Sequence, residues 1–273
     1  MKLDTFVPTA AELNERLLKR YTEVVEIGAL RKLAAERDLS SLFVPAVSDS
    51  YATSKVRTMI VGRETAGWGS TLRKDLAHPD RMSSVRAYLD HQMQFHRRKV
   101  GTVAERSKFF QFYREAARTM AAPAERAARD APVWANLFCF DAAKTRPVRG
   151  DDTASGEIVR LSGALLRVQL EVLRPQLIVF TTGSSCDRYL KQMFSGLAVS
   201  QVHIPKRIWE FTLPICNNAG GEERVTAFRT PHPRHAGSNR ARSAILAEAL
   251  APGALADYLV SASAAVQVPA GHP

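Results

Sequence analysis

The run Lys55-Val-Arg-Thr-Met-Ile-Val61, with Gly62-Arg-Glu-Thr65 directly behind it, predicts the first strand of a buried sheet. It is short, apolar and rich in β-branched residues, and it ends abruptly at a glycine. Three more runs of this kind cover residues 132–138, 176–181 and 224–229. Each is followed closely by polar residues. The chain therefore contains four predicted strands whose carboxyl ends all carry polar sequence.

Helical periodicity fills the intervals between these strands. Apolar residues step by three or four over 158–172, and a Thr9/Glu12 capping box precedes a long helix expected over about 10–37. Two further helices are expected over about 184–193, with Ser184 as a plausible cap, and over about 239–250. Strands that alternate with helices of ten or more residues favour right-handed crossovers and a parallel sheet. The predicted class is α/β, a three-layer α/β/α sandwich with a central four-stranded parallel sheet.

The length of 273 residues lies near the upper limit for one hydrophobic core. We expect an N-terminal helical element over 1–54 that packs on the core, followed by an α/β domain over 55–250. Residues 251–273 are expected to form a partly disordered C-terminal tail. The simplest form of the protein is a monomer.

Composition narrows the class of partner. Lys and Arg number 38 against 27 Asp and Glu, a formal charge of +11, which favours a polyanion such as nucleic acid. No long uninterrupted apolar stretch is present, and the first residues lack the apolar run of a signal peptide, so we expect a cytoplasmic protein that does not span a membrane. Three scattered cysteines and the absence of an HExxH motif predict a reducing compartment, no metal and no cofactor.

The polar segments behind the strands locate the expected site. In parallel α/β sheets, ligands bind at the carboxyl ends of the strands. Here those ends carry Gly62-Arg-Glu-Thr65, Asn136 with Asp141, Thr182-Gly-Ser-Ser185 and Pro231-His-Pro-Arg-His235. Neither a GxGxxG fingerprint nor a GxxxxGK[ST] loop is present, so dinucleotide and P-loop nucleotide binding lose support.

In this order, the four strand ends resemble those of the uracil-DNA glycosylase superfamily, over roughly Lys55 to Leu250. That family's first strand ends in a glycine-led loop, GQDPY or GxNPG, where this chain has Gly62-Arg63-Glu64-Thr65-Ala66-Gly67. Its second strand carries an asparagine that reads the pyrimidine edge, similar to Asn136. Its third is a proline-led apolar run with a small-residue turn, similar to 174–185. Its HPSP motif, which precedes a minor-groove wedge, is similar to His232-Pro-Arg-His235.

The resemblance implies a DNA glycosylase, which flips a damaged or modified pyrimidine out of the duplex and hydrolyses its N-glycosidic bond to leave an abasic site. Glu64 would activate water, and His232 would donate a hydrogen bond to the departing base. The other implied contacts are to the substrate through Gly62, Arg63, Ala66, Trp68 and Asn136, and to DNA through Ser184, Arg234, His235 and Arg240. Five arginines and no acid lie over 224–242, which fits a strip of DNA backbone contacts.

Departures from the family pattern define the expected substrate. The family's more familiar acid is aspartate, and the longer Glu64 would shift the water or the base. A tyrosine closes off the 5-position of the base in the uracil-specific branch, whereas Ala66 stands here, which predicts room for thymine or for a bulkier base such as a modified cytosine of phage DNA. No lysine lies in the matched motifs, so the enzyme is expected to be monofunctional. The four-cysteine iron–sulfur cluster of other branches is not expected.

Other interpretations stay open. Glu64 is also compatible with a helix cap or a salt bridge, Asn136 with pairing buried backbone groups, and Trp68 with packing under the loop. The aromatic cluster is expected to belong to the core rather than to a stacking platform, and it comprises Phe109, Phe110, Phe112 and Tyr113. A catalytically silent nucleic-acid-binding protein of the same fold is the main alternative function. An unrelated α/β hydrolase is weaker, because the chain has no GxSxG elbow and no acidic metal cluster.

Overall fold

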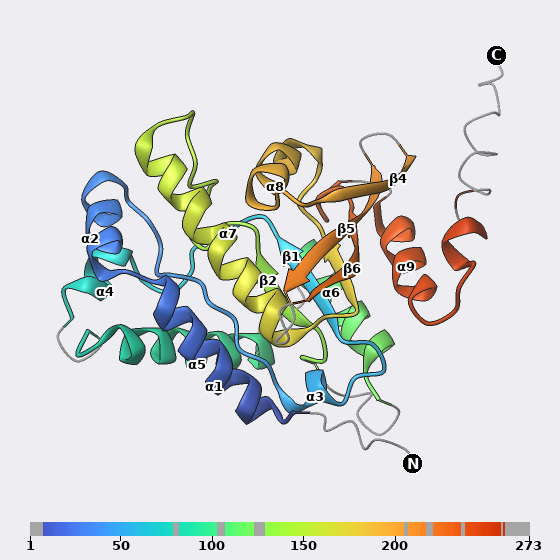
Figure 1. Ribbon diagram of the computed structural model, residues 1–273, viewed down its shortest axis with the longest axis horizontal. Coiled ribbons are helices and arrows are strands. Elements are labelled where there is room, and N and C mark those ends of the chain that lie inside the picture. The colour runs from blue at the N-terminus through green and yellow to red at the C-terminus, as the bar shows by residue number, and fades with distance from the viewer. Residues whose placement is uncertain are drawn as a thin grey trace.

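Six strands form one mixed sheet in the computed structural model, in the order β2-β1-β3-β6-β5-β4 (Figure 1). The structure describes residues 8–78, 82–102, 107–122, 129–204, 207–216, 221–235, 238–257 and 259. The strands are β1 (Thr58–Gly62), β2 (Val133–Asn136), β3 (Leu177–Phe180), β4 (Ala198–Ile204), β5 (Ile208–Cys216) and β6 (Glu222–Arg229). The helices are α1 (Ala10–Val24), α2 (Ile27–Glu36), α3 (Asp49–Ala52), α4 (Leu72–Leu76), α5 (Val85–Thr102), α6 (Lys108–Met120), α7 (Thr153–Leu173), the 3₁₀ helix η2 (Ser184–Cys186), α8 (Asp187–Met193) and α9 (Ser238–Glu248).

The four strands predicted from the sequence form the parallel part of this sheet. β1 lies parallel to β2 and to β3, and β3 lies parallel to β6. The register places Gly62 opposite Asn136, so the segments that follow β1 and β2 leave the sheet side by side. The expected α/β class is confirmed, and the polar strand ends lie along one edge of the sheet.

The prediction of a four-stranded, wholly parallel sheet was wrong. β5 pairs antiparallel with β6 and β4 pairs antiparallel with β5, so a hairpin extends one side of the sheet. Apolar and polar residues alternate over much of Ile208–Cys216, as in a half-buried strand, but Pro214 disfavoured that interpretation. The proline fits because the pairing of β4 with β5 reaches only Thr212, so the backbone at Pro214 needs no N–H donor on that side.

Alternate side chains of the strands pack into two separate cores. Met59 and Val61 lie in one cluster with the buried residues of α1 and α7, whereas Ile60 lies in a second cluster with those of α6 and α9. All three side chains are fully buried. Figure 1 shows α7 crossing in front of β1 and β2, with α1 beside it. The sheet is therefore the middle layer of three.

The N-terminal segment forms two helices rather than the single helix expected over 10–37. The Thr9/Glu12 capping box is present at the start of α1, as predicted. α1 ends at Val24, because Val25 is extended (φ −91°, ψ 116°) and turns its side chain into the core. α1 packs on α7 and on α5, so this segment belongs to the core of the domain.

The packed structure continues past residue 250. Leu255 is buried in the cluster that holds Ile245 and Leu246 of α9. Packing therefore extends to Leu255, and the disorder predicted for the rest of 251–273 lies almost wholly outside the described residues.

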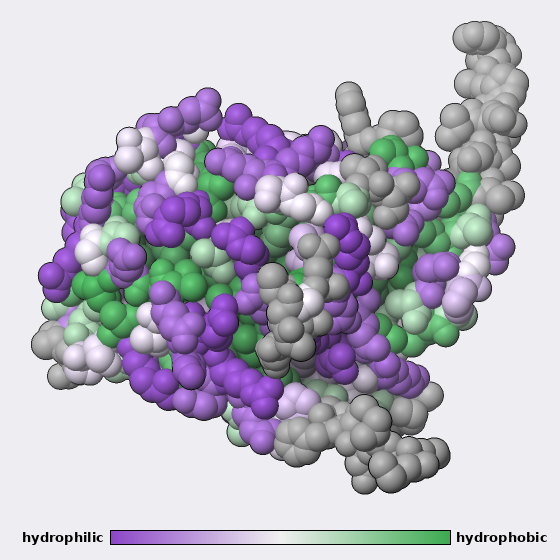
Figure 2. Space-filling view, viewed as in Figure 1, coloured by the Kyte–Doolittle hydropathy of each residue, from purple (hydrophilic) through white to green (hydrophobic). Residues whose placement is uncertain are grey.

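The surface facing the viewer in Figure 2 is largely hydrophilic, with apolar residues showing between the helices at its left. Within the described ranges, no helix has both the length and the apolar character needed to cross a lipid bilayer.

Candidate active site

A cavity of about 590 Å³ opens at the carboxyl edge of the parallel strands. It brings together side chains from the loop after β1, the end of β2 and the loop after β6. Eight of the eleven predicted site residues line it, namely Gly62, Arg63, Glu64, Ala66, Trp68, Asn136, His232 and Arg234. Three of the four polar strand-end segments therefore meet at one cavity, whereas residues 182–185 after β3 do not line it.

The loop that carries Glu64 is held by a buried carboxylate. Asp141 Oδ2 accepts hydrogen bonds from Thr65 Oγ1 at 2.6 Å, Gly67 N at 3.0 Å and Trp68 N at 3.2 Å. Its Oδ1 accepts from Lys144 N at 2.8 Å. Ionised acceptors form the stronger hydrogen bonds, so one side chain fixes the loop over Glu64. In the sequence, Asp141 is one polar residue behind a predicted strand, and no local pattern predicts this function for it.

The carboxylate of Glu64 has few polar contacts to offset its burial. Its Oε1 lies 3.6 Å from Nη2 of Arg63, and its Oε2 is buried with no hydrogen-bond partner among the described residues. Burial raises the pKa of Glu64, and the charges of Arg63 and Arg146 oppose this increase. A helix cap or an exposed salt bridge does not describe this group. It is a desolvated carboxylate beside a cavity, with one oxygen that has no partner among the described residues.

The raised pKa of Glu64 predicts a stabilising substitution. A carboxyl whose pKa is higher in the folded than in the unfolded chain stabilises the fold at low pH and loses that contribution as pH rises through its folded pKa. At pH 7, Glu64→Gln should therefore raise the melting temperature, by about 2–4 °C for each kcal/mol relieved. The gain should shrink at pH 4. Thermal unfolding at both pH values is the measurement, with the exposed Glu36→Gln as control; a lower melting temperature at pH 7 contradicts the prediction.

Asn136 is buried at the end of β2, and its amide faces two neighbours. Its Oδ1 accepts a hydrogen bond from Trp134 Nε1 at 3.1 Å, while its Nδ2 is buried without a partner in the described part of the chain. A Cβ added to Gly62 would lie 2.5 Å from Oδ1. A glycine is therefore required at the end of β1 for the amide to reach the cavity. The alternative in which Asn136 satisfies buried backbone groups has no support in these contacts.

His232 is half-buried and neutral at physiological pH. Burial lowers its pKa to about 4, and the nearby charges of Arg63 and Arg234 act in the same direction. Its Nδ1 accepts a hydrogen bond from Arg234 N at 3.3 Å. Because one ring nitrogen of neutral histidine is an acceptor and the other a donor, the proton is on Nε2. The imidazole is thus a neutral hydrogen-bond donor.

The aromatic residues divide between core and cavity. Trp68 is 5% exposed and makes edge contacts with Phe43 and Trp134, so it packs under the loop although one side reaches the cavity. Phe109 lies directly over the strand end, with a ring carbon 3.3 Å from the position of a Cβ on Gly62. Phe112 and Tyr113 are core residues, as expected, whereas Phe109 and Phe110 line the cavity. Phe109 and Phe110 also pack against the core cluster, so the expectation of core residues holds for all four, and the contribution of these two to the cavity lining was not predicted.

The predicted DNA contacts are only partly gathered at this site. Arg234 is exposed at the cavity, but Ser184, His235 and Arg240 are exposed outside its lining. Ser184 is the first residue of η2, and no side chain caps η2 or α8, so its predicted capping role was wrong. The preceding residue, Gly183, lies close to the loop after β6: a Cβ added to it would be 3.5 Å from His232 N.

The predicted strip of five arginines over 224–242 was wrong. Arg229 is buried and paired with Asp187 at 2.9 Å, and Arg242 is buried over the ring of Phe112. Arg224 lies opposite Pro214, toward the start of β6 and away from the site. Side chains alternate between the two faces of β6, and only one face of α9 packs on the core, so these arginines point in different directions.

Other cations take their place around the cavity. Lys99, Lys108 and Lys144 line it. The stem of Lys144 lies across Gly67, where a Cβ would be 3.3 Å from Lys144 Cε, and the φ of +89° at Gly67 also favours glycine. Arg146 donates to Ser185 Oγ at 3.1 Å and so connects the loops after β2 and β3. No lysine lies in the four strand-end motifs of the sequence, but the fold brings three lysines from elsewhere in the chain to the cavity.

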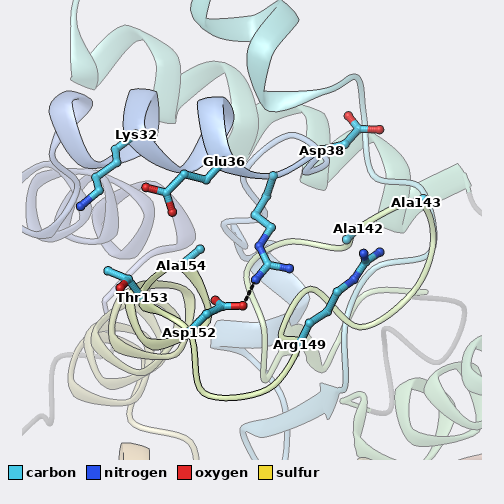
Figure 3. Close-up of a pocket in the computed structure, with 10 residues that line it drawn as sticks. Lys32, Glu36, Asp38, Ala142, Ala143, Arg149, Asp152, Thr153 and Ala154 are labelled. Carbon is cyan, nitrogen blue, oxygen red and sulfur yellow. Dashed lines mark hydrogen bonds and ion pairs between the residues drawn. The ribbon is translucent and has the colours of Figure 1, made fainter.

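A second cavity of about 680 Å³ lies between α2 and the start of α7 (Figure 3). Its charges are matched: Arg37 pairs with Asp152, which also accepts from Ser155 N at 2.8 Å. The hydrogen bond from Ser155 N and, to a smaller extent, the contact with Arg37 lower the pKa of Asp152. None of the described residues lining it has a buried polar atom without a partner. The reactive features are therefore concentrated at the strand-end cavity.

Comparisons with known protein families, with curated proteins and with solved structures find no match to this chain. In the described part of the chain, no group of three His, Cys, Asp or Glu side chains is placed to hold a metal ion. The fold and the site together define an α/β protein with an acid, an amide and a neutral histidine in one strand-end cavity.

Proposed function

We propose that this chain is a DNA glycosylase that flips a damaged or modified pyrimidine and hydrolyses its N-glycosidic bond. One observation carries the proposal. Glu64, Asn136 and His232 line a single cavity, Glu64 Oε2 and Asn136 Nδ2 are buried without a partner in the described protein, and the Nδ1 bond of His232 leaves its proton on Nε2. The resemblance of the four strand ends to uracil-DNA glycosylases assigns these same residues to water, base edge and base oxygen.

The chemistry follows from the charges that develop when the bond breaks. As the C1′–N bond lengthens, its electron pair moves onto the base and positive charge develops on the sugar. The carboxylate of Glu64 would stabilise that positive charge and take a proton from the water whose oxygen bonds to C1′. His232 Nε2–H would donate to the base oxygen, and the charges of Arg63 and Arg234 would favour the anionic base.

The cavity supports a substrate larger than uracil. Ala66 and Gly67 are exposed at its wall, where the uracil-specific branch has a closing tyrosine. Phe109 and Phe110 add apolar surface to the lining. A base with a bulkier substituent at its 5-position is therefore proposed alongside uracil: a 5-substituted uracil in first place, and a modified cytosine of phage DNA as the less favoured substrate.

Cations around the cavity support DNA as the partner. Arg146 and Arg234 act electrostatically on Glu64, so both lie near the reacting groups. Together with the three lysines and the net charge of +11, they are suited to bind phosphates. A silent DNA-binding protein would share these cations, but it has no need of a desolvated acid at the bottom of the cavity.

The test is strand cleavage of labelled duplexes containing uracil, a thymine mismatch, hypoxanthine, or hydroxymethylated or glucosylated cytosine. We expect abasic sites from at least one pyrimidine, with strand breaks that appear only after alkali, as for a monofunctional enzyme. Breaks without alkali would indicate a lysine-dependent lyase step and contradict the monofunctional proposal. DNA binding without cleavage of any substrate would favour the silent binding protein.

The pH dependence of excision follows from the two pKa shifts. Glu64 must be ionised to activate water, and its pKa is raised, while His232 must be neutral and has a pKa of about 4. The single-turnover rate should therefore fall as pH is lowered, first as Glu64 takes up a proton and then, near pH 4, as His232 does. Rates measured between pH 4 and 8 check this. A rate that increases on acidification would contradict these roles.

A further inference from the structure

The orientation of the Asn136 amide is determined by a tryptophan. Trp134, two residues earlier on β2, donates from Nε1 to Asn136 Oδ1 at 3.1 Å. An indole nitrogen is a donor only, so the amide atom that faces it must be the oxygen. The amide nitrogen then has to face elsewhere. It is buried without a partner among the described residues, and Asn136 lines the cavity, so the amide nitrogen is available to an acceptor on a ligand.

Trp134 is itself held in place. Its carbonyl accepts from His96 Nε2 at 3.1 Å, and His96 Nδ1 accepts from Ala46 N at 3.2 Å. Burial lowers the pKa of His96 to about 3, so this bridge keeps one polarity at all ordinary pH values. The indole ring packs against Phe43 and Phe110 at centroid distances of 4.9 and 5.0 Å. The donor is therefore rigid.

The sheet order indicates which part of the base meets each amide atom. β1 lies between β2, which ends in Asn136, and β3 and β6, the last of which leads to His232. Asn136 Oδ1 leans toward β1, since it lies where a side chain on Gly62 would begin. The oxygen is thus the amide atom on the His232 side. With the pyrimidine O2 at His232, that oxygen meets position 3 and Nδ2 meets position 4.

We propose that Trp134 is a positioning residue that sets the hydrogen-bond polarity of the cavity and so favours pyrimidines with an oxygen at position 4 over those with an amino group. The inference rests on the proposed function for its choice of base. A 4-oxo base offers N3–H to Oδ1 and O4 to Nδ2. A 4-amino base presents the opposite polarity, and it would require the amide to rotate and lose its bond from Trp134.

The experiment compares two bases that differ only at position 4. Single-turnover excision is measured on duplexes with 5-hydroxymethyluracil or 5-hydroxymethylcytosine, for the wild type, Trp134→Phe and Trp209→Phe. We expect the wild type to favour 5-hydroxymethyluracil and Trp134→Phe to reduce that ratio by about three- to tenfold, the size expected from one neutral hydrogen bond. Trp209 on β5 lies outside the cavity lining, and its buried Nε1 has no hydrogen-bond partner in the described structure, so Trp209→Phe should leave the ratio unchanged. An unchanged ratio in Trp134→Phe, or an equal change in both variants, overturns the proposal.

Two measurements without DNA separate this inference from the proposed function. In the wild type, the Trp134 indole N–H should exchange with deuterated water more slowly than that of Trp68, although both side chains are buried. Free thymine should shift the NMR signals of the Asn136 amide more than 5-methylcytosine does. These results with no excision from DNA would remove the glycosylase and keep the role of Trp134. Equal exchange of the two indoles, or an equal response to the two bases, overturns that role.

Discussion

Glu64→Gln should reduce abasic-site formation by about 10²–10⁴-fold, the range typical of a missing general base. The substitution keeps the length and the shape of the side chain but removes the only buried carboxylate oxygen without a partner in the described cavity lining. It cannot take a proton from water, and it cannot balance positive charge on the sugar. The measurement is single-turnover cleavage, revealed by alkali, of the best substrate in the panel.

Binding separates a catalytic role from a structural one. Duplex affinity of Glu64→Gln should equal or exceed that of the wild type, because a negative charge leaves a site surrounded by arginines. The matched control is Glu36→Gln, an exposed glutamate on α2 that should retain full activity. Loss of binding together with activity would show that Glu64 supports the loop rather than the reaction. Full activity in Glu64→Gln would remove the proposed mechanism.

The parallel part of the fold was predictable because each strand has a strong local signal. Apolar runs bounded by glycine or proline identify β1, β2, β3 and β6, and parallel pairing then places their carboxyl ends together. That step alone predicted that Glu64, Asn136 and His232 share a site. The hairpin of β4 and β5 was missed since Pro214 weakens the pattern of β5 and its tolerance depends on where β4 stops.

The remainder of the site depends on contacts between residues far apart in the sequence. Phe109 reaches Gly62 only because α6 packs across β1. The amphipathic pattern of α6 predicts a buried face, but it does not show which apolar side chains of that face line a cavity. Arginines over 224–242 look alike in the sequence, yet Arg229 and Arg242 are buried by their positions on β6 and α9. Arginines that are close in the sequence form a basic surface only where the backbone places their side chains in solvent.

Asp141→Asn should be strongly destabilising and should also inactivate the site, although Asp141 lines no part of the cavity. Its two carboxylate oxygens accept four hydrogen bonds, and the side chain is 2% exposed. An amide of the same shape presents an NH₂ group to some of these donors, whichever way it turns. The favoured orientation keeps the oxygen at Thr65, Gly67 and Trp68, so the NH₂ group then faces the N–H of Lys144 and both donors are left without an acceptor.

Each buried group left unpaired costs about 1–3 kcal/mol, so the loss for two is about 2–6 kcal/mol in the free energy of unfolding. Urea unfolding measures it, and Asp38→Asn, an exposed aspartate in the loop after α2, is the control that should change little. Activity should fall even in conditions where the variant stays folded, because the loop that aims Glu64 is no longer fixed. A folded Asp141→Asn protein with wild-type stability and rate would show that the loop holds its shape through Arg63 and the backbone alone. The predicted result would instead assign to Asp141 the preorganisation on which the proposed chemistry depends.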